Sequence, residues 1–557
     1  MNIQKKKKKI INRKMFSLGI GKVISVSESV VLAVGLKGVR VGEIVTFGNR
    51  TGLKGLVMSF DRTYVKVTLV AGDPKRVFAG DVVERTGRLA ETISGWGIFG
   101  RIVTPLGGCL NTRKFPLDIL CWNEVFCVRK VLVDSDAPRI TERQRVRKFI
   151  QTGVNSVDCF LPIGCGQREL IVGDLGTGKT SLAITILLNQ KDINTGIWRY
   201  IEQFNYNTDR HQFFIPCIYV SIGGKRSEIK RLERLLDVQK ASSYSIIVYA
   251  GASDLAGVQY LAPLAGCAMG EWYRNRGHHP IVIYDDLSNH ATAYRYISLM
   301  LRRPPGREAY PGDMFYVHAK LLERAAQLHI RLGGGSLTAF PIVETKQGDL
   351  SGYIPTNVIS ITDGQIFLSS KLKNQGMMPA VDLNLSVSRV GARAQPNMLA
   401  DMSKKIKVSY SFYRAYASIE QVGGEVDPTI LSYLNRGKKI VEYLRQDLFK
   451  TESLYKQVFC FYCINNGHLD KIQPQYVLFY FRMMFHPGIL DYAINNADTW
   501  FLVVDTEFEM LTAYVKSKHY KHLQKLFQKF VEIFDFFFSR NYTELIDERF
   551  NAIAHGH

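Results

Sequence analysis

The 557-residue sequence lacks the features that mark membrane, disulfide-rich and fibrous proteins. Its longest run without a charged residue, 255–270, is shorter than the roughly 18 residues of a membrane-spanning helix. The nine cysteines are scattered, which argues against a disulfide framework and favours a reducing compartment. Apolar residues make up 46% and charged residues 22%, which excludes a disordered chain, a collagen and a coiled coil. We therefore expect a globular protein of several domains without a membrane span.

Acidic residues are scarce relative to basic ones, and residues 1–17 contain none at all. The formal net charge of +22 favours an anionic partner, such as a nucleotide, a nucleic acid or an acidic subunit. The basic segment 1–17 allows two interpretations that both remain open. It is either a mitochondrial presequence, which is typically basic and poor in acids, or a retained and solvated tail.

The order of patterns along the chain predicts three domains. In 18–92, short alternating runs separated by glycine indicate a small all-β barrel. In 93–395, apolar strands such as 169–172 and 281–284 alternate with helical stretches, which is typical of a mainly parallel α/β sheet. In 396–557 the strands stop and helical periodicity follows, for example from Leu523 to Phe534.

The strongest motif is GDLGTGKT at 173–180, which lies between an apolar strand and a helical stretch. Its glycines allow backbone N–H groups to surround a β-phosphate, and the lysine neutralises the β- and γ-phosphate oxygens. The helix that follows directs the positive end of its dipole at the same phosphates. We predict nucleotide contacts from Gly173, Asp174, Gly176, Thr177, Gly178, Lys179, Thr180 and Ser181.

Two acidic residues follow the apolar strand 280–284 and predict a magnesium site. Asp285 would hold Mg²⁺ through a water, and Thr180 would bind the ion directly, because Mg²⁺ keeps several waters and takes few carboxylates. Asp286 is better interpreted as the cap of the helix that begins at Leu287.

Six longer motifs resemble the α subunit of F-type ATP synthase: 284–288, 301–313, 321–326, 333–339, 353–368 and 385–391. The resemblance implies a six-stranded β-barrel, a central RecA-like phosphate-loop domain and a helical C-terminal domain. It further implies a rotary, hexameric head of alternating α and β subunits that supports proton-driven ATP synthesis. In that head the α subunit binds Mg-ATP or Mg-ADP without turning it over, and catalysis takes place mainly on β.

The resemblance also implies partners and a location. The partners are the β subunit, the γ subunit of the central stalk and a peripheral-stalk subunit. Nucleic acid is not expected, and the chain would meet the membrane only through the complex. The implied location is the matrix side of the mitochondrial inner membrane, as a peripheral subunit.

By the same resemblance, Arg389 reaches into the catalytic site of β as an arginine finger. Its planar cation would stabilise charge that spreads over the γ-phosphoryl oxygens in the transition state. Ser360 and Gly364 would line the same interface, and Pro379 and Gln446 would contact the bound base. The residue types alone leave a buried ion-pair arginine open at position 389.

The chain departs from catalytic members of the family at one decisive place. Hydrolysis needs a carboxylate that orients the attacking water, and Gly224 stands where that acid is wanted. The nearby Glu228 is better interpreted as an acid at the start of a helix. The alternative function, an autonomous RecA-like ATPase of the secretion or RNA-translocase type, needs that carboxylate.

The chain also departs from the usual α pattern, which has polar residues at five places where this chain has Leu175, Gly176, Gly224, Met378 and Leu448. We therefore hypothesise that its own site binds nucleotide weakly. The segment 191–216 is longer than in the family, and we predict a surface loop there, with a lineage-specific contact as the alternative.

Overall fold

The computed structural model describes residues 19–48, 52–110, 128–203, 214–422, 428–470 and 472–484. The basic segment 1–17 and the helix predicted from Leu523 to Phe534 lie outside these residues. Contacts divide the chain into two units, which are described separately. Unit 1 is Met1–Lys148, Gly164–Gly376 and Ala380–Gly391, and unit 2 is Phe149–Ile163, Met377–Pro379 and Ala392–His557. The predicted limits 18–92, 93–395 and 396–557 stay predictions, because this division does not separate the barrel from the sheet.

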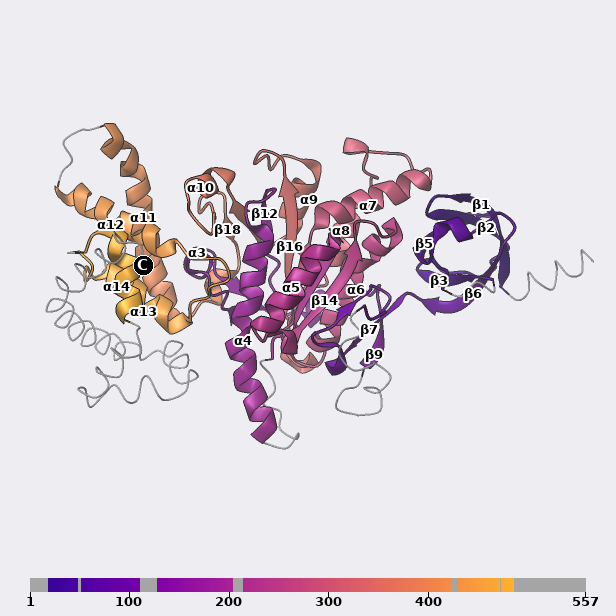
Figure 1. Cartoon of the computed structure of the whole chain (residues 1–557), viewed down its shortest axis with the longest axis horizontal. Helices are drawn as coiled ribbons and strands as arrows, with labels where there is room; N and C mark the ends of the chain where they lie inside the picture. The colour runs from indigo at the N-terminus through magenta and orange to yellow at the C-terminus, as the bar shows by residue number, and fades with distance from the viewer. Residues whose placement is uncertain are drawn as a thin grey trace, which may run out of the picture. The chain divides into compact units, whose positions relative to one another are not determined.

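Unit 1 begins with a closed antiparallel barrel in the order β1-β2-β5-β4-β3-β6 (Figure 1). Its strands are β1 (Ile20–Ser27), β2 (Val30–Val34), β3 (Glu43–Phe47), β4 (Lys54–Phe60), β5 (Val65–Ala71) and β6 (Val82–Leu89). Inward-facing valines such as Val31, Val57 and Val67 are fully buried, as the alternating pattern requires. The six-stranded barrel is confirmed.

The sheet of unit 1 has eight strands in the order β18-β17-β12-β16-β15-β13-β14-β8, and all pairs are parallel except β17 with β18. The strands are β8 (Ile102–Val103), β12 (Leu170–Asp174), β13 (Cys217–Gly224), β14 (Ser245–Gly251), β15 (Ile281–Asp285), β16 (Thr338–Thr345), β17 (Gly364–Leu368) and β18 (Val387–Ser388). Unit 1 also contains β7 (Glu91–Gly95), paired with β9 (Val128–Leu132), whereas β10 (Phe149–Ile150), paired with β11 (Ile163–Gly164), begins the first segment of unit 2. The predicted parallel α/β core is confirmed, and the carboxyl ends of its central strands meet at one edge.

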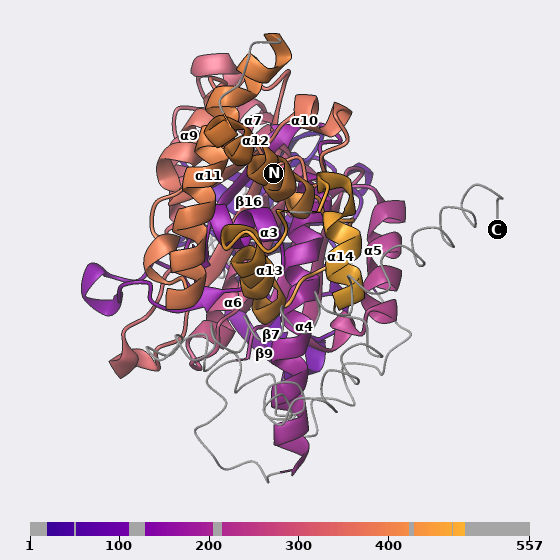
Figure 2. The same cartoon turned by 90° about the vertical axis from the view of Figure 1, so that its left-hand side faces the viewer.

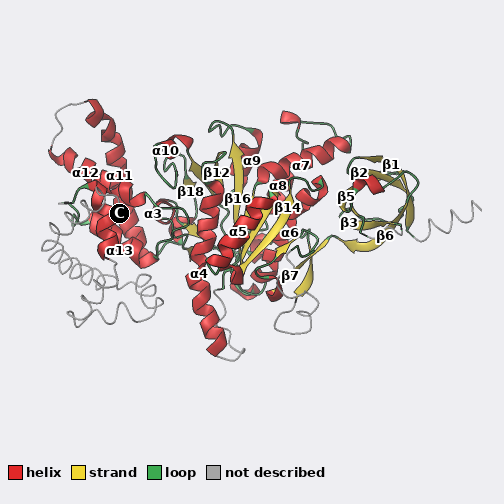
Figure 3. Ribbon diagram, in the orientation of Figure 1, coloured by secondary structure: helices red, strands yellow, loops and turns green. Residues whose placement is uncertain are grey.

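Helices lie along this sheet, as the red ribbons beside the yellow strands in Figure 3 show. They are α4 (Lys179–Gln203), α5 (Arg226–Val238), α6 (Ala256–Arg274), α7 (Leu287–Met300), α8 (Met314–Leu322), α9 (Tyr353–Ile361) and α10 (Ser370–Asn374). Among the helices of the described ranges, none combines the length and the apolar character that crossing a bilayer requires.

The surface loop predicted for 191–216 is wrong over its first half, because α4 continues to Gln203 as one long helix (Figure 2). Extending an existing helix adds a backbone hydrogen bond for each residue without the cost of a new nucleus. The Asn194 side chain donates to the Ile215 carbonyl and accepts from its N–H, both at 2.9 Å. This pair brings the end of the segment back to the helix, while 204–213 lie outside the described residues.

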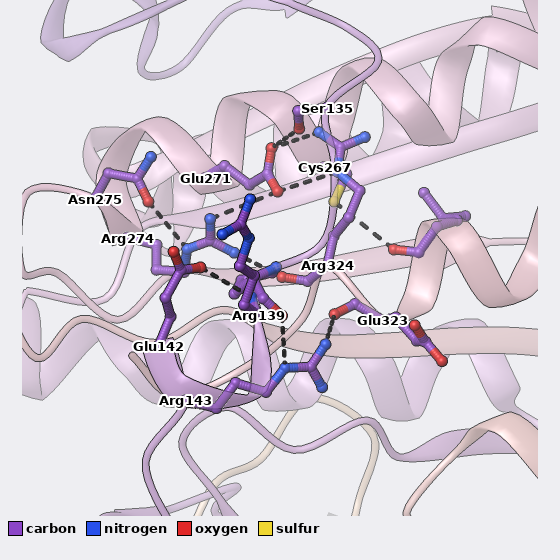
Figure 4. A network of polar contacts seen from close by, with 12 residues as sticks. Ser135, Arg139, Glu142, Arg143, Cys267, Glu271, Arg274, Asn275, Glu323 and Arg324 are labelled. Carbon is purple, nitrogen blue, oxygen red and sulfur yellow. Dashed lines mark hydrogen bonds and ion pairs between the residues drawn. The ribbon is translucent and has the colours of Figure 1, made fainter. Parts of the chain in front are cut away.

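A buried ion-pair network joins three segments of unit 1 (Figure 4). Arg324 has no exposed side-chain surface, and its guanidinium donates to both carboxylate oxygens of Glu271, at 3.1 and 2.5 Å. It also donates to the Val133 carbonyl at 3.0 Å, while the Ser135 hydroxyl donates to Glu271 at 2.6 Å. Although burial acts to raise it, the pKa of Glu271 is lowered by Arg324. The network therefore ties α6 to the end of α8 and to the segment after β9.

Unit 2 is helical, as predicted for the C-terminal part of the chain. Its helices are α3 (Asn155–Phe160), α11 (Asn397–Val422), α12 (Pro428–Leu444), α13 (Leu454–Asn465) and α14 (Val477–Met484). Asp158 of α3 is buried and accepts hydrogen bonds from Thr152, Gly153 and Gln457. Burial raises the pKa of Asp158 to about 6 even though these bonds lower it. The segment around α3 is thereby joined to α13.

Candidate functional site

The loop between β12 and α4 has the backbone that its glycines predict. Gly176 and Gly178 have φ angles of 75° and 100°, which side chains other than glycine rarely adopt. A Cβ on Gly173 would stand 2.5 Å from the Leu368 carbonyl oxygen of the adjacent β17. Gly173 and Gly178 therefore require glycine, whereas at Gly176 the φ angle favours glycine but a Cβ would have room. A strand–loop–helix of this kind is a ready anion-binding site.

Lys179 lies at the base of this loop and is mostly buried. Its Nζ donates to the Gly173 carbonyl at 2.8 Å and to the Asp174 carbonyl at 2.7 Å. Burial lowers the pKa of Lys179, because the charged form loses solvation. Four carboxylates act in the opposite direction: Glu344, Asp286, Asp285 and Asp174.

The two residues predicted for magnesium lie together. The Thr180 hydroxyl donates to Asp285 Oδ2 at 2.8 Å, and the Tyr219 hydroxyl donates to the same oxygen at 2.6 Å. Burial raises the pKa of Asp285, while the two hydroxyls and Lys179 act to lower it. A hydroxyl and a carboxylate are hard oxygen ligands, so this pair fits a magnesium ion.

Asp286 caps α7, as the sequence predicts, because its Oδ1 accepts from the Asn289 N–H at 2.7 Å. Burial raises its pKa to about 7, with further contributions from Asp285 and Glu344. Sequence reasoning missed Glu344, which lies beside Gly173 in the register of β16 with β12. An acid at the carboxyl end of an apolar strand is a signal that could have found it.

The carboxylate of Asp174 links the phosphate loop to neighbouring segments. It accepts hydrogen bonds from the Thr345 hydroxyl at 2.8 Å, the Gly348 N–H at 2.7 Å and the Ser370 hydroxyl at 3.0 Å. Against the effect of burial, these bonds and Lys179 hold the pKa of Asp174 below its usual value. The Asp174 side chain therefore shapes the loop.

The remaining loop residues differ in exposure. Leu175 is 82% exposed at the tip of the loop, and Ser181 is half-buried in the first turn of α4. The Thr177 hydroxyl donates to the Asp174 carbonyl at 2.8 Å. Lys373 of α10 donates to the Gly176 carbonyl at 2.8 Å, a contact that no motif indicated.

The carboxyl end of β13 carries a glycine at position 224, where we expect an acid in catalytic members of the family. Gly224 ends the strand, and a Cβ there would stand 2.3 Å from the Ser221 hydroxyl oxygen. A side chain therefore fits only if Ser221 moves. Glu228 lies in the first turn of α5, which confirms its interpretation as a helix-start acid.

Arg389 follows directly after β18, and its side chain is exposed. Its N–H donates to the Asp363 carbonyl at 3.0 Å, and no ion pair of its guanidinium occurs among the described residues. Gly364 begins β17 and pairs with Ser388 of β18. Ser360 is exposed near the end of α9, where its hydroxyl donates to the Asn357 carbonyl at 2.7 Å. The alternative of a buried ion-pair arginine is therefore wrong.

Pro379 and Gln446 both belong to unit 2, where the Gln446 N–H donates to the Met378 carbonyl at 2.8 Å. The Gln446 amide group donates to the carbonyls of Gly153 and Lys450, both at 2.7 Å. Its oxygen accepts from the Asn155 N–H at 3.2 Å. The amide is thus engaged with backbone groups of its own unit.

Two family models match the chain. Residues 153–388 match the nucleotide-binding domain of the ATP synthase alpha/beta family, and residues 395–487 match the C-terminal domain of the ATP synthase alpha/beta chain. The chain is 43% identical to "ATP synthase subunit alpha" of Neorickettsia sennetsu over 85% of this chain and 88% of that protein. It is 42% identical to the protein of that name from Wolbachia pipientis subsp. Culex pipiens, over 88% and 92% of the two chains. The corresponding protein of Anaplasma marginale is 44% identical over 79% of this chain and 82% of its own length.

Proposed function

We infer the role of this chain from the family to which it belongs, the α subunits of F-type ATP synthase, which match it over most of its length. As such it is a nucleotide-binding subunit of the complex that synthesises ATP. We propose that it is the non-catalytic, regulatory subunit of the rotary head. In this proposal it alternates with β in a hexamer, contacts the γ subunit and a peripheral-stalk subunit, and has no nucleic-acid partner.

One observation carries the non-catalytic assignment. The phosphate side of the site is complete, since the glycine loop, Lys179 and the Thr180–Asp285 pair are all in place. At the end of β13, however, Gly224 offers no carboxylate to orient an attacking water, and Ser221 occupies the adjacent space. A site that binds phosphates but does not activate a water molecule can hold a nucleotide without hydrolysing it.

The proposed ligand is Mg-ATP or Mg-ADP. Thr180 would bind the ion directly and Asp285 through a water, and the ion would neutralise phosphate oxygens. Within the described ranges, no three side chains of His, Cys, Asp or Glu gather as a metal site. The pair therefore suits an ion that takes most of its ligands from water and phosphate.

We further propose that Arg389 serves the catalytic site of the neighbouring β subunit, with Ser360 beside it. Its exposure at the end of β18 supports this role, because an exposed guanidinium that forms no ion pair with the residues the structure describes is available to another subunit. The proposed location is peripheral, on the matrix side of the mitochondrial inner membrane, with membrane contact only through the complex. The relatives named above are bacterial and lend no support to the mitochondrial part.

The isolated chain is expected to show no ATP turnover, because it lacks the water-orienting carboxylate. Hydrolysis is measured with the purified chain and with the head reassembled from this chain and its β subunit, which should be active. A matched Lys179→Met variant separates intrinsic turnover from contamination. Turnover by the isolated chain that Lys179→Met abolishes would favour the alternative, an autonomous RecA-like ATPase.

The chain's own site is expected to bind nucleotide one to three orders of magnitude more weakly than α sites that have polar residues at the positions of Leu175 and Gly176. The reason is that each lost hydrogen bond costs about 0.5–1.5 kcal/mol of binding free energy. Leu175 is exposed at the tip of the loop, so Leu175→Arg can be accommodated there. A hydrogen bond to a charged group contributes about 1.5–3 kcal/mol, so Leu175→Arg should tighten binding about tenfold or more.

Equilibrium binding to the assembled head with the β sites blocked measures this affinity. Leu448→Gln serves as the second restored position, and Ile140→Arg, at an exposed residue far from the loop in sequence, is the charge control. Nanomolar binding by the unaltered chain, or equal affinities for Leu175→Arg and the control, would show the hypothesis to be wrong.

A further inference from the structure

We propose that Gln167, Arg168 and Glu169, the three residues before β12, are positioning residues that hold Arg389 in place. The proposal rests on the role of Arg389 proposed above. Arg389 stands at the end of a two-residue strand and is exposed, so little burial of its own fixes its direction. Stabilising a transition state requires a cation held to within a fraction of an ångström. The anchoring must therefore come from neighbouring segments.

The first contact that anchors Arg389 is a bidentate ion pair, or fork, between Arg168 and Asp363. Arg168 donates through Nε to Asp363 Oδ2 at 3.1 Å and through Nη2 to Oδ1 at 2.7 Å. The two backbones also join, because the Asp363 N–H donates to the Arg168 carbonyl at 2.8 Å. The carbonyl of the same Asp363 accepts the Arg389 N–H. The backbone of Arg389 is thus hydrogen-bonded to Asp363. Arg168 in turn binds both the side chain and the backbone of Asp363.

The second anchor passes through Gln167, which is fully buried. Its Nε2 donates to Glu169 Oε2 at 2.7 Å and to the Ser388 hydroxyl at 3.0 Å. Its Oε1 accepts from the Gly164 N–H at 3.0 Å, which fixes the orientation of the amide. Ser388, directly before Arg389, is therefore hydrogen-bonded to the Gln167 amide, whose orientation is fixed.

Glu169 is the third residue of the proposed support, and it binds the Gln167 amide. It is fully buried, and its second oxygen, Oε1, has no hydrogen-bond partner within the described part of the chain. Burial raises the pKa of Glu169 well above its usual value, while Gln167 and the charge of Arg389 act to lower it. The buried carboxyl group thus fixes Nε2 of Gln167, which also binds the hydroxyl of Ser388 beside Arg389.

Gly364 shows how tightly this space is closed. A Cβ at Gly364 would stand 2.7 and 2.9 Å from the two oxygens of Glu169, and 2.2 Å from the Val387 carbonyl oxygen. Only glycine lets β17 pass between the Glu169 carboxyl group and β18. This position was predicted to line the subunit interface, and its packing supplies a separate reason for glycine.

The anchors also connect the finger to the phosphate loop. Glu169 is followed directly by β12, which ends at Asp174 in the loop, so one short strand of about 17 Å joins the two ends. One end of β12 therefore leads into the chain's own phosphate loop. The other end adjoins the residues that we propose to position Arg389.

The test measures ATP hydrolysis by the head assembled from this chain and its β subunit. Arg168→Met is expected to lower kcat about 10- to 100-fold with KM unchanged, because the finger is misplaced while nucleotide contacts remain. Arg168→Lys, which keeps the charge and one hydrogen bond, should recover part of the loss. The control is Arg85→Met, which removes a similar fork in the barrel, where Arg85 donates to both oxygens of Glu43 at 3.0 and 3.1 Å. It should leave kcat unchanged.

A double-mutant cycle separates positioning from stability. In an Arg389→Ala background, Arg168→Met should have no further effect on kcat, because the residue it positions is gone. An equal loss in both backgrounds, or an assembled Arg168→Met head with normal kcat, would overturn the proposal. Should Arg168→Met not assemble, Ser388→Ala enters the same cycle, since it removes only the hydroxyl that Gln167 binds. If Arg389→Ala itself leaves kcat unchanged, the proposed role of Arg389 fails instead.

Discussion

Arg389→Ala is expected to lower kcat for ATP hydrolysis by the assembled head about a thousandfold or more, the usual effect of removing an arginine finger. The guanidinium would meet charge that develops on the γ-phosphoryl oxygens only in the transition state, so the loss falls on kcat with little change in KM. Steady-state kinetics of the head with variant and unaltered chains measures this. Nucleotide binding to this chain's own site should stay unchanged.

Two variants control this experiment. Arg389→Lys keeps the charge without the planar fork and should recover only part of the rate. Arg393→Ala removes an equally charged and exposed arginine four residues further along, and it should leave kcat within about twofold of normal, as surface changes usually do. A head with Arg389→Ala that turns over at the normal rate would rule out the finger, and so would equal losses in the Arg389 and Arg393 variants.

The largest effect on stability is expected from Arg324→Met. This change removes the closer of the two arginine partners of the buried Glu271 carboxylate and leaves only Arg274, at 3.6 Å, so the free energy of unfolding should fall by up to about 3–5 kcal/mol. The double variant Arg324→Met/Glu271→Leu should recover only part of the loss, because it removes the buried carboxylate but also the ion pair of the buried Arg274, which lies 3.6 Å from Glu271. Thermal unfolding of the purified chain, followed by circular dichroism, measures the three midpoints.

The control for this prediction is an exposed ion pair. Lys66 lies 3.6 Å from Asp61 on the barrel surface, and Lys66→Met should change the stability by no more than about 1 kcal/mol. A single Arg324 variant that melts with the unaltered chain would contradict the role of the buried network. A double variant that melts even lower than the single one would show that the lost Arg274 ion pair outweighs the removal of the unpaired carboxylate.

The phosphate loop and the acids around it show how far local patterns reach. The spacing of Gly173, Gly178 and Lys179 predicted a loop between a strand and a helix, and the structure has that loop. Asp285 was found because an acid ended an apolar strand. Glu344 ends a strand in the same way but was missed, because its pairing beside Gly173 depends on the order of strands in the sheet.

The long segment after the loop shows where a local pattern fails, and the residue Gln446 shows what such a pattern leaves open. Polar and aromatic residues in 191–216 indicated a loop, yet α4 continues through 203, because an established helix propagates wherever nothing stops it. Gln446 matched a base-contacting position by resemblance. Its amide is hydrogen-bonded to the backbone of Gly153, Asn155 and Lys450, which only the packing of unit 2 could reveal, and the contact with the base stays a prediction.

The amino-acid sequence by itself determined the order of barrel, phosphate-loop core and helical part, the family, and the absence of an acid at Gly224, because each depends on spacing within one stretch of chain. Only the tertiary structure decided which distant residues meet. Arg168 and Asp363 are 195 positions apart, and their fork exists because β12 and β17 are neighbours in the sheet. Hydrogen bonds and ion pairs act over a few ångströms, so the contacts that we propose to support Arg389 form only in the folded sheet.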